Sequence, residues 1–176
     1  MLWGLLSIAT AMAQPDYYIT TEGTMMIEAV FLDSAITAKS KKVTVLIDYN
    51  SGEFQLFFDA STLNTGILAL DTLLAKEKNH VIQYEGRFGL DHVQTESHPP
   101  LDFTVDGSIN CSDHNGSVRG NGRLVHLSNV YSCYLNMTFD LKLDQLPFDI
   151  AVDGLDENIR IVIVQMLLYQ NSGSTY

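Results

Sequence analysis

The sequence predicts an all-β fold, a single antiparallel eight-stranded β-barrel with one short helix inserted mid-chain. Three observations favour this fold. One long segment alternates apolar and polar residues, about eight such segments follow one another through short turns, and one stretch near the middle has helical spacing instead. Consecutive strands joined in this way build an antiparallel barrel or sandwich, and the length of the longest segment favours the barrel.

The longest alternating segment runs from Tyr131 to Leu143. Its odd-numbered residues are apolar, and its even-numbered residues are polar except for Tyr134. Because successive side chains of a strand point to opposite faces, one face must lie in an apolar interior and the other in water. At about 3.3 Å per residue the segment spans roughly 40 Å. That length suits a closed or strongly curved sheet better than a usual strand of about five or six residues.

Further strands are predicted from the same alternation and from turn residues between them. They are residues 25–32, 36–42, 43–49, 54–58, 82–91, 102–111 and 118–127, with turns at Asp33-Ser34, Asn50-Ser51-Gly52, Asn115-Gly116 and Ser128-Asn129. The last segment, residues 159–168, is apolar at both parities and rich in β-branched residues. This composition predicts a strand that is covered on both sides.

The helix is predicted over residues 67–78. Ile67, Leu70 and Leu74 recur at helical spacing among strong helix formers. Asn79 is its expected C-terminal stop. This is the one stretch of the chain where helical spacing replaces strand alternation.

The N-terminal segment from Leu2 to Ala13 is apolar and uncharged and ends in Ala11-Met12-Ala13. This pattern predicts a signal peptide over residues 1–13 and a mature protein that begins at Gln14. The alternative is a buried N-terminal helix, because the segment is shorter than the about 20 residues that span a bilayer. We therefore expect a secreted protein, with one barrel domain over residues 14–170 and a frayed tail over residues 171–176.

The 176-residue chain is strongly acidic, with 21 acidic and 10 basic residues and a formal net charge of −11. Such a surface repels phosphate backbones and anionic lipid head groups. Nucleic acid is therefore excluded as an expected partner, and stable membrane insertion is not expected because no long apolar segment follows residue 13.

The chain has two cysteines, Cys111 and Cys133. A secreted protein with two cysteines often forms a disulfide. With turns at Asn115-Gly116 and Ser128-Asn129, Cys111 faces the region of Arg119 and Cys133 faces Val125, so the two lie roughly 20 Å apart. A disulfide needs Cα atoms within about 7 Å. We expect two buried free thiols, whereas a different turn register would permit the bond.

Several short motifs resemble those of the YceI-like family of secreted bacterial lipocalin-shaped proteins. They are Ser61-Thr62-Leu63-Asn64-Thr65-Gly66 after a strand, Asp71 and Leu74 in the following helix, Pro99 and Pro100 before a strand with an inward Phe103, the Gly-x-Leu hairpin from Gly122 to Leu124, and the long amphipathic strand. The resemblance runs from about Gly23 to Val164. It implies an elongated lipocalin-like barrel that binds a polyisoprenoid chain, such as the tail of an isoprenoid quinone, in its interior. It also implies a bacterial protein that is secreted or periplasmic.

Inward-facing apolar residues are the candidates for lining such a ligand cavity. They are Phe54, Phe58, Phe88, Phe103, Leu124, His126, Leu135, Met137, Phe139 and Leu141. Gly120 and Gly122 would leave a groove beside Leu124, unless they mark a bulge or a barrel corner. Core packing explains the same aromatic residues equally well. His126 would meet a polar head group or be a satisfied core histidine.

No motif in the sequence indicates catalysis or a metal site. The nucleophile elbow G-x-S-x-G, a phosphate-binding glycine loop and histidine pairs at metal-ligand spacing are all missing from the printed sequence. The sequence therefore predicts a non-enzymatic protein that holds an isoprenoid-type or fatty amphiphile, with no cofactor or metal. The alternatives are a structural or interaction barrel filled by its own side chains, and a hydrolase or isomerase built around His126.

Overall fold

The computed structural model describes residues 17–20, 23–76, 81–89, 99–111, 114–127, 132–146 and 152–171. The predicted signal peptide, the helix stop at Asn79 and the turn at Ser128-Asn129 lie outside the described residues. So does the predicted tail, except for Asn171.

The described residues form ten strands, one α-helix and two short 3-10 helices. In chain order these are β1 (Tyr17–Thr20), β2 (Met25–Phe31), β3 (Ser34–Ser40), β4 (Val43–Asp48), β5 (Glu53–Asp59), η1 (Ala60–Thr62), α1 (Leu68–Lys76), β6 (Val81–Phe88), β7 (Leu101–Cys111), β8 (His114–His126), β9 (Ser132–Lys142), η2 (Leu143–Gln145) and β10 (Asn158–Asn171). The predicted long strand and mid-chain helix are both present.

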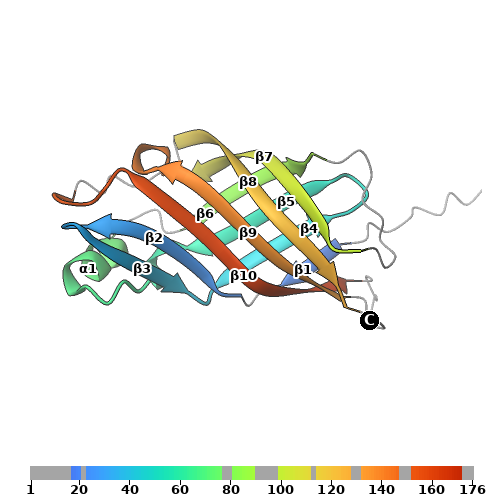
Figure 1. Cartoon of the computed structure of the whole chain (residues 1–176), viewed down its shortest axis with the longest axis horizontal. Coiled ribbons are helices and arrows are strands. Elements are labelled where there is room, and N and C mark those ends of the chain that lie inside the picture. Colours follow the sequence, from blue (N-terminus) through green and yellow to red (C-terminus); the bar gives the residue numbers. More distant parts are fainter. Residues whose placement is uncertain are drawn as a thin grey trace, which may run out of the picture.

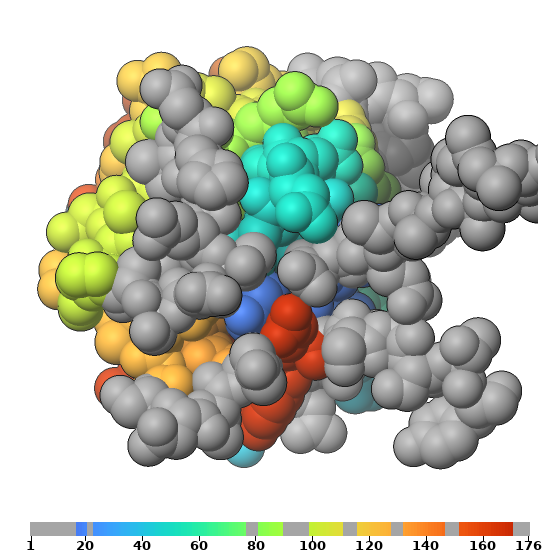
Figure 2. All heavy atoms as spheres, turned by 90° about the vertical axis from the view of Figure 1, so that its right-hand side faces the viewer, coloured from blue at the N-terminus to red at the C-terminus, as the bar shows by residue number. Residues whose placement is uncertain are grey.

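The strands form a closed antiparallel barrel. The order is β1-β4-β5-β6-β7-β8-β9-β10, and β1 pairs with β10 to close these eight strands. The β2–β3 hairpin attaches to the first half of β10, and α1 lies beside this hairpin at one end of the barrel (Figure 1). At the other end the last residues of β10 lie against β1 (Figure 2). The predicted fold class is therefore confirmed.

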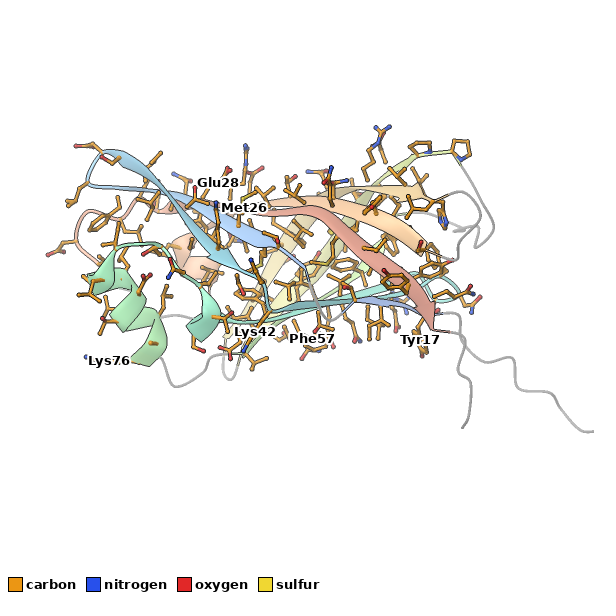
Figure 3. The ribbon with its side chains drawn as sticks, turned by 90° about the horizontal axis from the view of Figure 1, so that it is seen from below. Tyr17, Met26, Glu28, Lys42, Phe57 and Lys76 are labelled. Atoms are coloured by element: carbon orange, nitrogen blue, oxygen red, sulfur yellow. The ribbon has the colours of Figure 1, made fainter. Side chains whose placement is uncertain are left out.

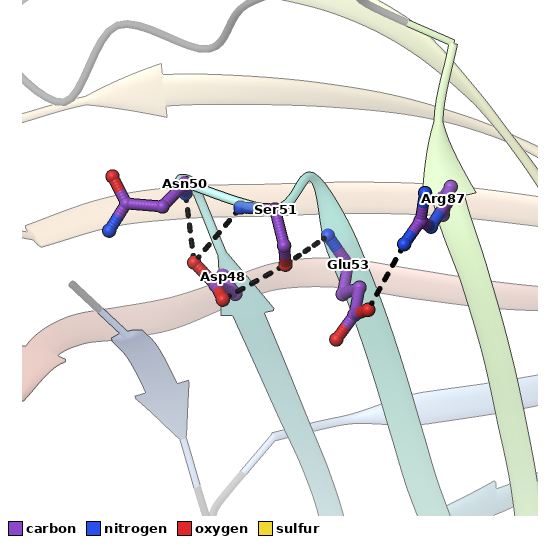
Figure 4. Close-up of polar contacts among 5 residues, drawn as sticks. All are labelled: Asp48, Asn50, Ser51, Glu53 and Arg87. Carbon is purple, nitrogen blue, oxygen red and sulfur yellow. Dashed lines mark hydrogen bonds and ion pairs between the residues drawn. The ribbon is translucent and has the colours of Figure 1, made fainter. Parts of the chain in front are cut away.

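The hairpin between β4 and β5 turns where the sequence predicted, and a carboxylate fixes it. Asp48 Oδ1 accepts hydrogen bonds from the backbone N–H groups of Asn50 at 2.8 Å and Ser51 at 3.3 Å. Asp48 Oδ2 accepts a hydrogen bond from the Ser51 hydroxyl at 2.9 Å, and Arg87 forms an ion pair of 3.3 Å with Glu53 beside the turn (Figure 4). The turn thus satisfies backbone donors that the strand ladder leaves unpaired.

Two predicted turns are wrong in position. The β2–β3 turn is centred on Leu32-Asp33, whose φ angles of 49° and 59° suit a tight hairpin turn, one residue before the predicted Asp33-Ser34. The β7–β8 turn lies between Cys111 and His114, so Asn115 and Gly116 belong to β8. The predicted Gly-x-Leu hairpin also lies inside β8.

The observed β7–β8 register has a packing reason. Phe103 lies opposite Gly122, and a Cβ at Gly122 would collide with the Phe103 ring. Val105 lies opposite Gly120, where a Cβ would collide with Phe139 and Met137. The glycines therefore make room for large inward side chains. A turn at Asn115-Gly116 would have placed other residues of β8 opposite Phe103 and Val105. The glycines do not leave an empty groove beside Leu124.

The register also separates the cysteines. Cys111 lies opposite His114 and Cys133 opposite His126, at the two ends of β8. Cys133 is a buried free thiol, which confirms the expectation for this residue.

β10 is covered on one side only, in contrast to the prediction. Ile159, Ile161 and Ile163 are buried, whereas Met166 and Leu168 are the buried residues further along. A bulge between Ile163 and Met166 shifts the inward parity from odd to even. Inward apolar residues are therefore odd-numbered before the bulge and even-numbered after it, which makes the segment as a whole apolar at both parities. Val164 and Tyr169 point outward and are 38% and 58% exposed.

The middle of the barrel is packed by aromatic rings from four strands. Phe88 and Phe103 have ring centroids 4.7 Å apart, and Tyr84 and Phe139 have centroids 4.9 Å apart, both edge to face. Phe54 joins the two pairs, because its ring centroid lies 5.9 Å from that of Tyr84 and 6.0 Å from that of Phe88. Such pairs prefer this edge-to-face geometry and stabilise the core beyond their area alone.

We predict that Gly122→Ala destabilises the barrel by about 1–3 kcal/mol because the new methyl group overpacks the core against Phe103. In a Phe103→Leu background the same substitution should cost clearly less, since the colliding ring is absent. Urea unfolding of the two single variants and the double variant measures this coupling. Strictly additive costs would show that Phe103 does not fill the space above Gly122.

Candidate functional site

The ten residues predicted to line a ligand cavity lie in the described part of the barrel. Nine of them are buried members of one continuous hydrophobic core, namely Phe54, Phe58, Phe88, Phe103, Leu124, Leu135, Met137, Phe139 and Leu141. The rings among them contact one another or Tyr84 as described above, except that Phe58 forms no ring pair with another residue that the structure describes. The structure brings these residues together as packing partners, and their role in lining a ligand stays a prediction.

His126, the tenth, is half-buried near the β1 end of the barrel. Its ring centroid lies 6.1 Å from that of Tyr18 and 6.2 Å from that of Tyr49. Tyr18 and Tyr49 pack edge to face at 4.6 Å, and the Tyr49 hydroxyl lies 3.7 Å from Cys133 Sγ. His126 is therefore part of an aromatic cluster.

Two titratable groups of this cluster, Cys133 and Tyr49, have raised pKa values. Burial raises the pKa of the Cys133 thiol to about 11, although the Tyr49 hydrogen bond opposes this shift. Burial also raises the pKa of Tyr49, and Cys133 adds to that effect. A reactive cysteine needs a lowered pKa, so Cys133 lacks the electrostatic surroundings of a nucleophile. Among the described residues, no three His, Cys, Asp or Glu side chains gather as a metal site would require.

An apolar cavity of about 70 Å³ lies at the other end of the barrel, between α1, the β2–β3 hairpin and η2. Thirteen residues line it, and all except Thr65 are apolar: Ile27, Ala29, Ile36, Ala38, Leu63, Thr65, Leu70, Leu73, Leu74, Leu143, Leu146, Leu155 and Ile159. None of the ten predicted lining residues is among them. This partly open cavity is the candidate functional site, because aliphatic side chains line it without filling it.

The Ser61–Gly66 motif builds one wall of the cavity. The Asp59 carboxylate accepts hydrogen bonds from the Ser61 N–H at 2.9 Å and the Ser61 hydroxyl at 2.6 Å, which caps η1. Asn64 then exchanges two backbone hydrogen bonds of 2.9 Å with Lys39 of β3. The motif therefore ties the free edge of the hairpin to the barrel and directs Leu63 into the cavity.

Asp71 fixes the approach to α1. Its Oδ1 accepts both the backbone N–H and the hydroxyl of Thr65 at 2.7 Å. Gly66, at φ +75°, makes the turn between them possible. The hydroxyl of Thr65 and then its N–H stabilise the charged carboxylate, so the pKa of Asp71 is lowered.

α1 itself is held by a small apolar face. Leu70 and Leu74 are buried, whereas Leu68 is 82% exposed and Leu73 is 47% exposed. Lys76 points away from the barrel at the end of the helix (Figure 3). No helix in the described part of the chain is long and apolar enough to cross a membrane.

Sequence reasoning missed most of the cavity because its lining combines residues from several separate elements. The predicted helix did contain Leu70 and Leu74, and the motif contained Leu63 and Thr65. Leu146 and Leu155, between η2 and β10, lay outside every predicted element. The available signal was the poor alternation of β2 and β3, whose small inward residues Ala29 and Ala38 leave space.

Two solved structures share this fold. One is a polyisoprenoid-binding domain from Saccharophagus degradans implicated in plant cell wall breakdown, with a TM-score of 0.68, 13% identity and coverage of 89% of this chain and 99% of that one. The other is BcnA from Burkholderia cenocepacia, with a TM-score of 0.54, 11% identity and coverage of 82% and 94%. Both are YceI-like lipocalin-type barrels, which confirms the resemblance at the level of fold. No protein-family model and no curated protein sequence matches the chain.

We predict that Thr65→Val raises the pKa of Asp71 toward its ordinary value, because the largest stabilising contact of the carboxylate is removed. The matched control is Thr72→Val, since the Thr72 hydroxyl bonds to the Leu68 carbonyl and does not touch Asp71. An NMR titration of the Asp71 carboxylate measures both. Equal pKa values in wild type and Thr65→Val would contradict the assigned contact.

The sign of the pH effect follows from the lowered pKa. The contribution of Asp71 to stability is fully present above the carboxylate's unfolded pKa, near 4, and is lost as pH falls through the folded pKa. The protection of α1 amides against exchange, relative to their intrinsic rates at each pH, should therefore fall below about pH 4 in the wild type. The fall in protection should be weaker in Thr65→Val.

Proposed function

We propose that this protein is a non-enzymatic binding protein that holds the apolar chain of a small amphiphilic lipid in the cavity beneath α1. The observation that carries the proposal is a cavity lined by twelve apolar side chains and one threonine in an otherwise densely packed barrel. Each buried CH₂ group of a ligand contributes about 0.8 kcal/mol. Even a short length of chain therefore gains useful affinity before ordering costs.

The cavity as it stands accepts only the end of a chain. An engineered apolar cavity of about 150 Å³ holds one benzene molecule, and this cavity is about 70 Å³. We expect α1 to move outward for a longer chain, because its buried face is small and consists of Leu70 and Leu74.

Fold similarity favours an isoprenoid-type chain. The Saccharophagus degradans domain is a polyisoprenoid-binding domain with the same fold, and the likeness covers 89% of the present chain. On this basis we propose a polyisoprenoid, including the tail of an isoprenoid quinone, as the first ligand to test, with fatty chains as the second.

A structural or interaction barrel without a ligand is the second candidate function. The observation that favours it is the packing of the barrel centre, where Phe103, Met137 and Phe139 fill the space above Gly120 and Gly122. In this account the cavity beneath α1 is a packing defect. The two candidates differ in whether any chain binds there.

We also propose that residues 1–13 direct export and that the mature protein works in the periplasm or outside the cell. The Ala11-Met12-Ala13 pattern supports this proposal. N-terminal sequencing of protein exported by a bacterial host should begin at Gln14. A product that retains Leu2–Ala13 in the cytoplasm would contradict it.

The binding test fills the cavity with a side chain. Ala38 faces the cavity from β3, whereas Ala75 is exposed on α1 and does not line the cavity. Ala38→Phe should lower affinity for isoprenoid alcohols at least tenfold, as measured by native mass spectrometry across a series of chain lengths. The control Ala75→Phe should bind as the wild type does.

Folding of each variant is checked by circular dichroism and urea unfolding. If Ala38→Phe does not fold, Leu73→Trp at the partly exposed cavity rim provides the same test with less disturbance of the core. Undiminished binding by a folded cavity-filled variant would place the chain elsewhere. Failure of the wild type to bind any isoprenoid or fatty chain would leave the filled barrel as the function.

A further inference from the structure

The regular pairing between β2 and β10 is interrupted beside the apolar cavity. It stops at Glu28 and Arg160, and the next bond across the wall joins the Asp156 N–H to the Val30 carbonyl at 2.8 Å. Between these points one residue, Ala29, faces the three residues 157–159. We call this interruption, formed by Ala29, Val30, Asn158 and Ile159, the seam. The unequal numbers of residues on the two strands disrupt the hydrogen-bond ladder there, as in a β-bulge.

The seam lies between the apolar cavity and a groove of about 580 Å³ on the outer surface. Ala29 and Ile159 line both the cavity and the groove. Among the described residues, only these two line both, and the side chain of Ala29 is a single methyl group. The seam therefore separates the apolar interior from a polar surface by two residues.

The groove is polar and balanced in charge. Among its lining residues, Glu28 and Asp140 are acidic, and Lys142 and Arg160 are basic. Arg160 Nε bonds to Asp140 Oδ1 at 2.6 Å, and Arg160 lies opposite Glu28 in the sheet. Lys142 approaches Glu157 at 3.4 Å. Glu28 projects from the outer side of β2 (Figure 3).

Each basic side chain of the groove, Lys142 or Arg160, thus already has an acidic partner. A phosphate or carboxylate head group would have to compete with Asp140 or Glu157 for its cation and would meet Glu28 as a like charge. The Asn158 side-chain carbonyl, which accepts, and the Arg160 guanidinium, which donates, suit an uncharged group with hydrogen-bonding oxygens. Alcohol and quinone head groups have this chemistry.

We propose that the seam is a lateral portal and that the outer groove holds the uncharged polar head group of the lipid, while its chain passes between Ala29 and Ile159 into the cavity. This inference rests on the proposed function, because it requires a chain in the cavity. It adds the position of the head group and its chemical class.

The first test locates the head group in the full-length protein. An isoprenoid alcohol with a nitroxide beside its hydroxyl is added to isotope-labelled protein, and paramagnetic broadening of amide signals is measured. The portal predicts strong broadening at Glu28, Val30 and Asn158 and little at Leu68 and Leu73 on α1. Broadening confined to α1 would overturn the portal and leave the proposed chain site intact. Absence of binding would overturn both.

The second test concerns the charge of the head group. Glu28→Gln gives the residues that line the groove a net positive charge and leaves the Arg160–Asp140 ion pair in place. The affinity for an isoprenoid phosphate, relative to the alcohol of the same chain, should rise by about fivefold, which corresponds to one unit charge a few ångströms away in water.

Glu53→Gln is the matched control, because Glu53 also lies beside an arginine, Arg87, on the outer surface but far from the seam (Figure 4). It should leave the affinity ratio unchanged. A wild-type protein that prefers the phosphate to the alcohol would overturn the assignment of an uncharged head group. Equal changes of the affinity ratio in Glu28→Gln and Glu53→Gln would overturn the position of the head group.

Discussion

The closure of the barrel depends on the way β10 pairs with its neighbours. On one side β10 follows β9 along most of its length, and on the other side it pairs first with β2 and then with β1. The bulge at Val164 and Gln165 lies between these two halves. The Gln165 N–H, which leaves the ladder there, donates to the Asn136 side chain at 2.9 Å. The inward parity changes at this point, so both halves keep an apolar face on the interior.

This arrangement divides the interior into two parts of different character. In the aromatic half, which comprises the middle of the barrel and its β1 end, wide rings meet one another, and strand glycines give some of them space. In the half closed by the β2–β3 hairpin, the described residues that line the cavity include Ala29 and Ala38 and no aromatic residue. The Ser61–Gly66 motif, α1 and η2 cover this half from outside the strand ladder. A cavity remains there because small and aliphatic side chains fill the space less completely than interlocking rings do.

The sequence was sufficient to predict the class of fold, since the alternation of residues 131–143 and the hairpin around Ser51 depend on local rules. The register of β7 and β8 was not predictable in this way. Asn115-Gly116 has strong local turn chemistry, but the fit of Phe103 over Gly122 is a contact between distant residues. The two-sided hydrophobicity of residues 159–168 was misread because a bulge reverses parity without changing composition.

The candidate site was harder to predict for a related reason. The predicted lining residues were chosen because they face inward, and the nine buried ones do belong to the interior. Which inward residues pack against one another and which leave space depends on the distance across the barrel, which no pattern along one strand encodes. The Ser61–Gly66 motif was informative about the fold, and its physical role is to anchor the hairpin edge and start α1.

The central claim is that the interior is packed in its aromatic half and accessible to an apolar ligand beneath α1. Diffraction from a crystal held under xenon pressure tests it most directly, because xenon enters empty apolar cavities without needing a polar partner. The account predicts xenon density among Ala38, Leu63 and Leu74 and none between Phe103 and Phe139. Density along the barrel axis among the aromatic rings, or none beneath α1, would contradict it.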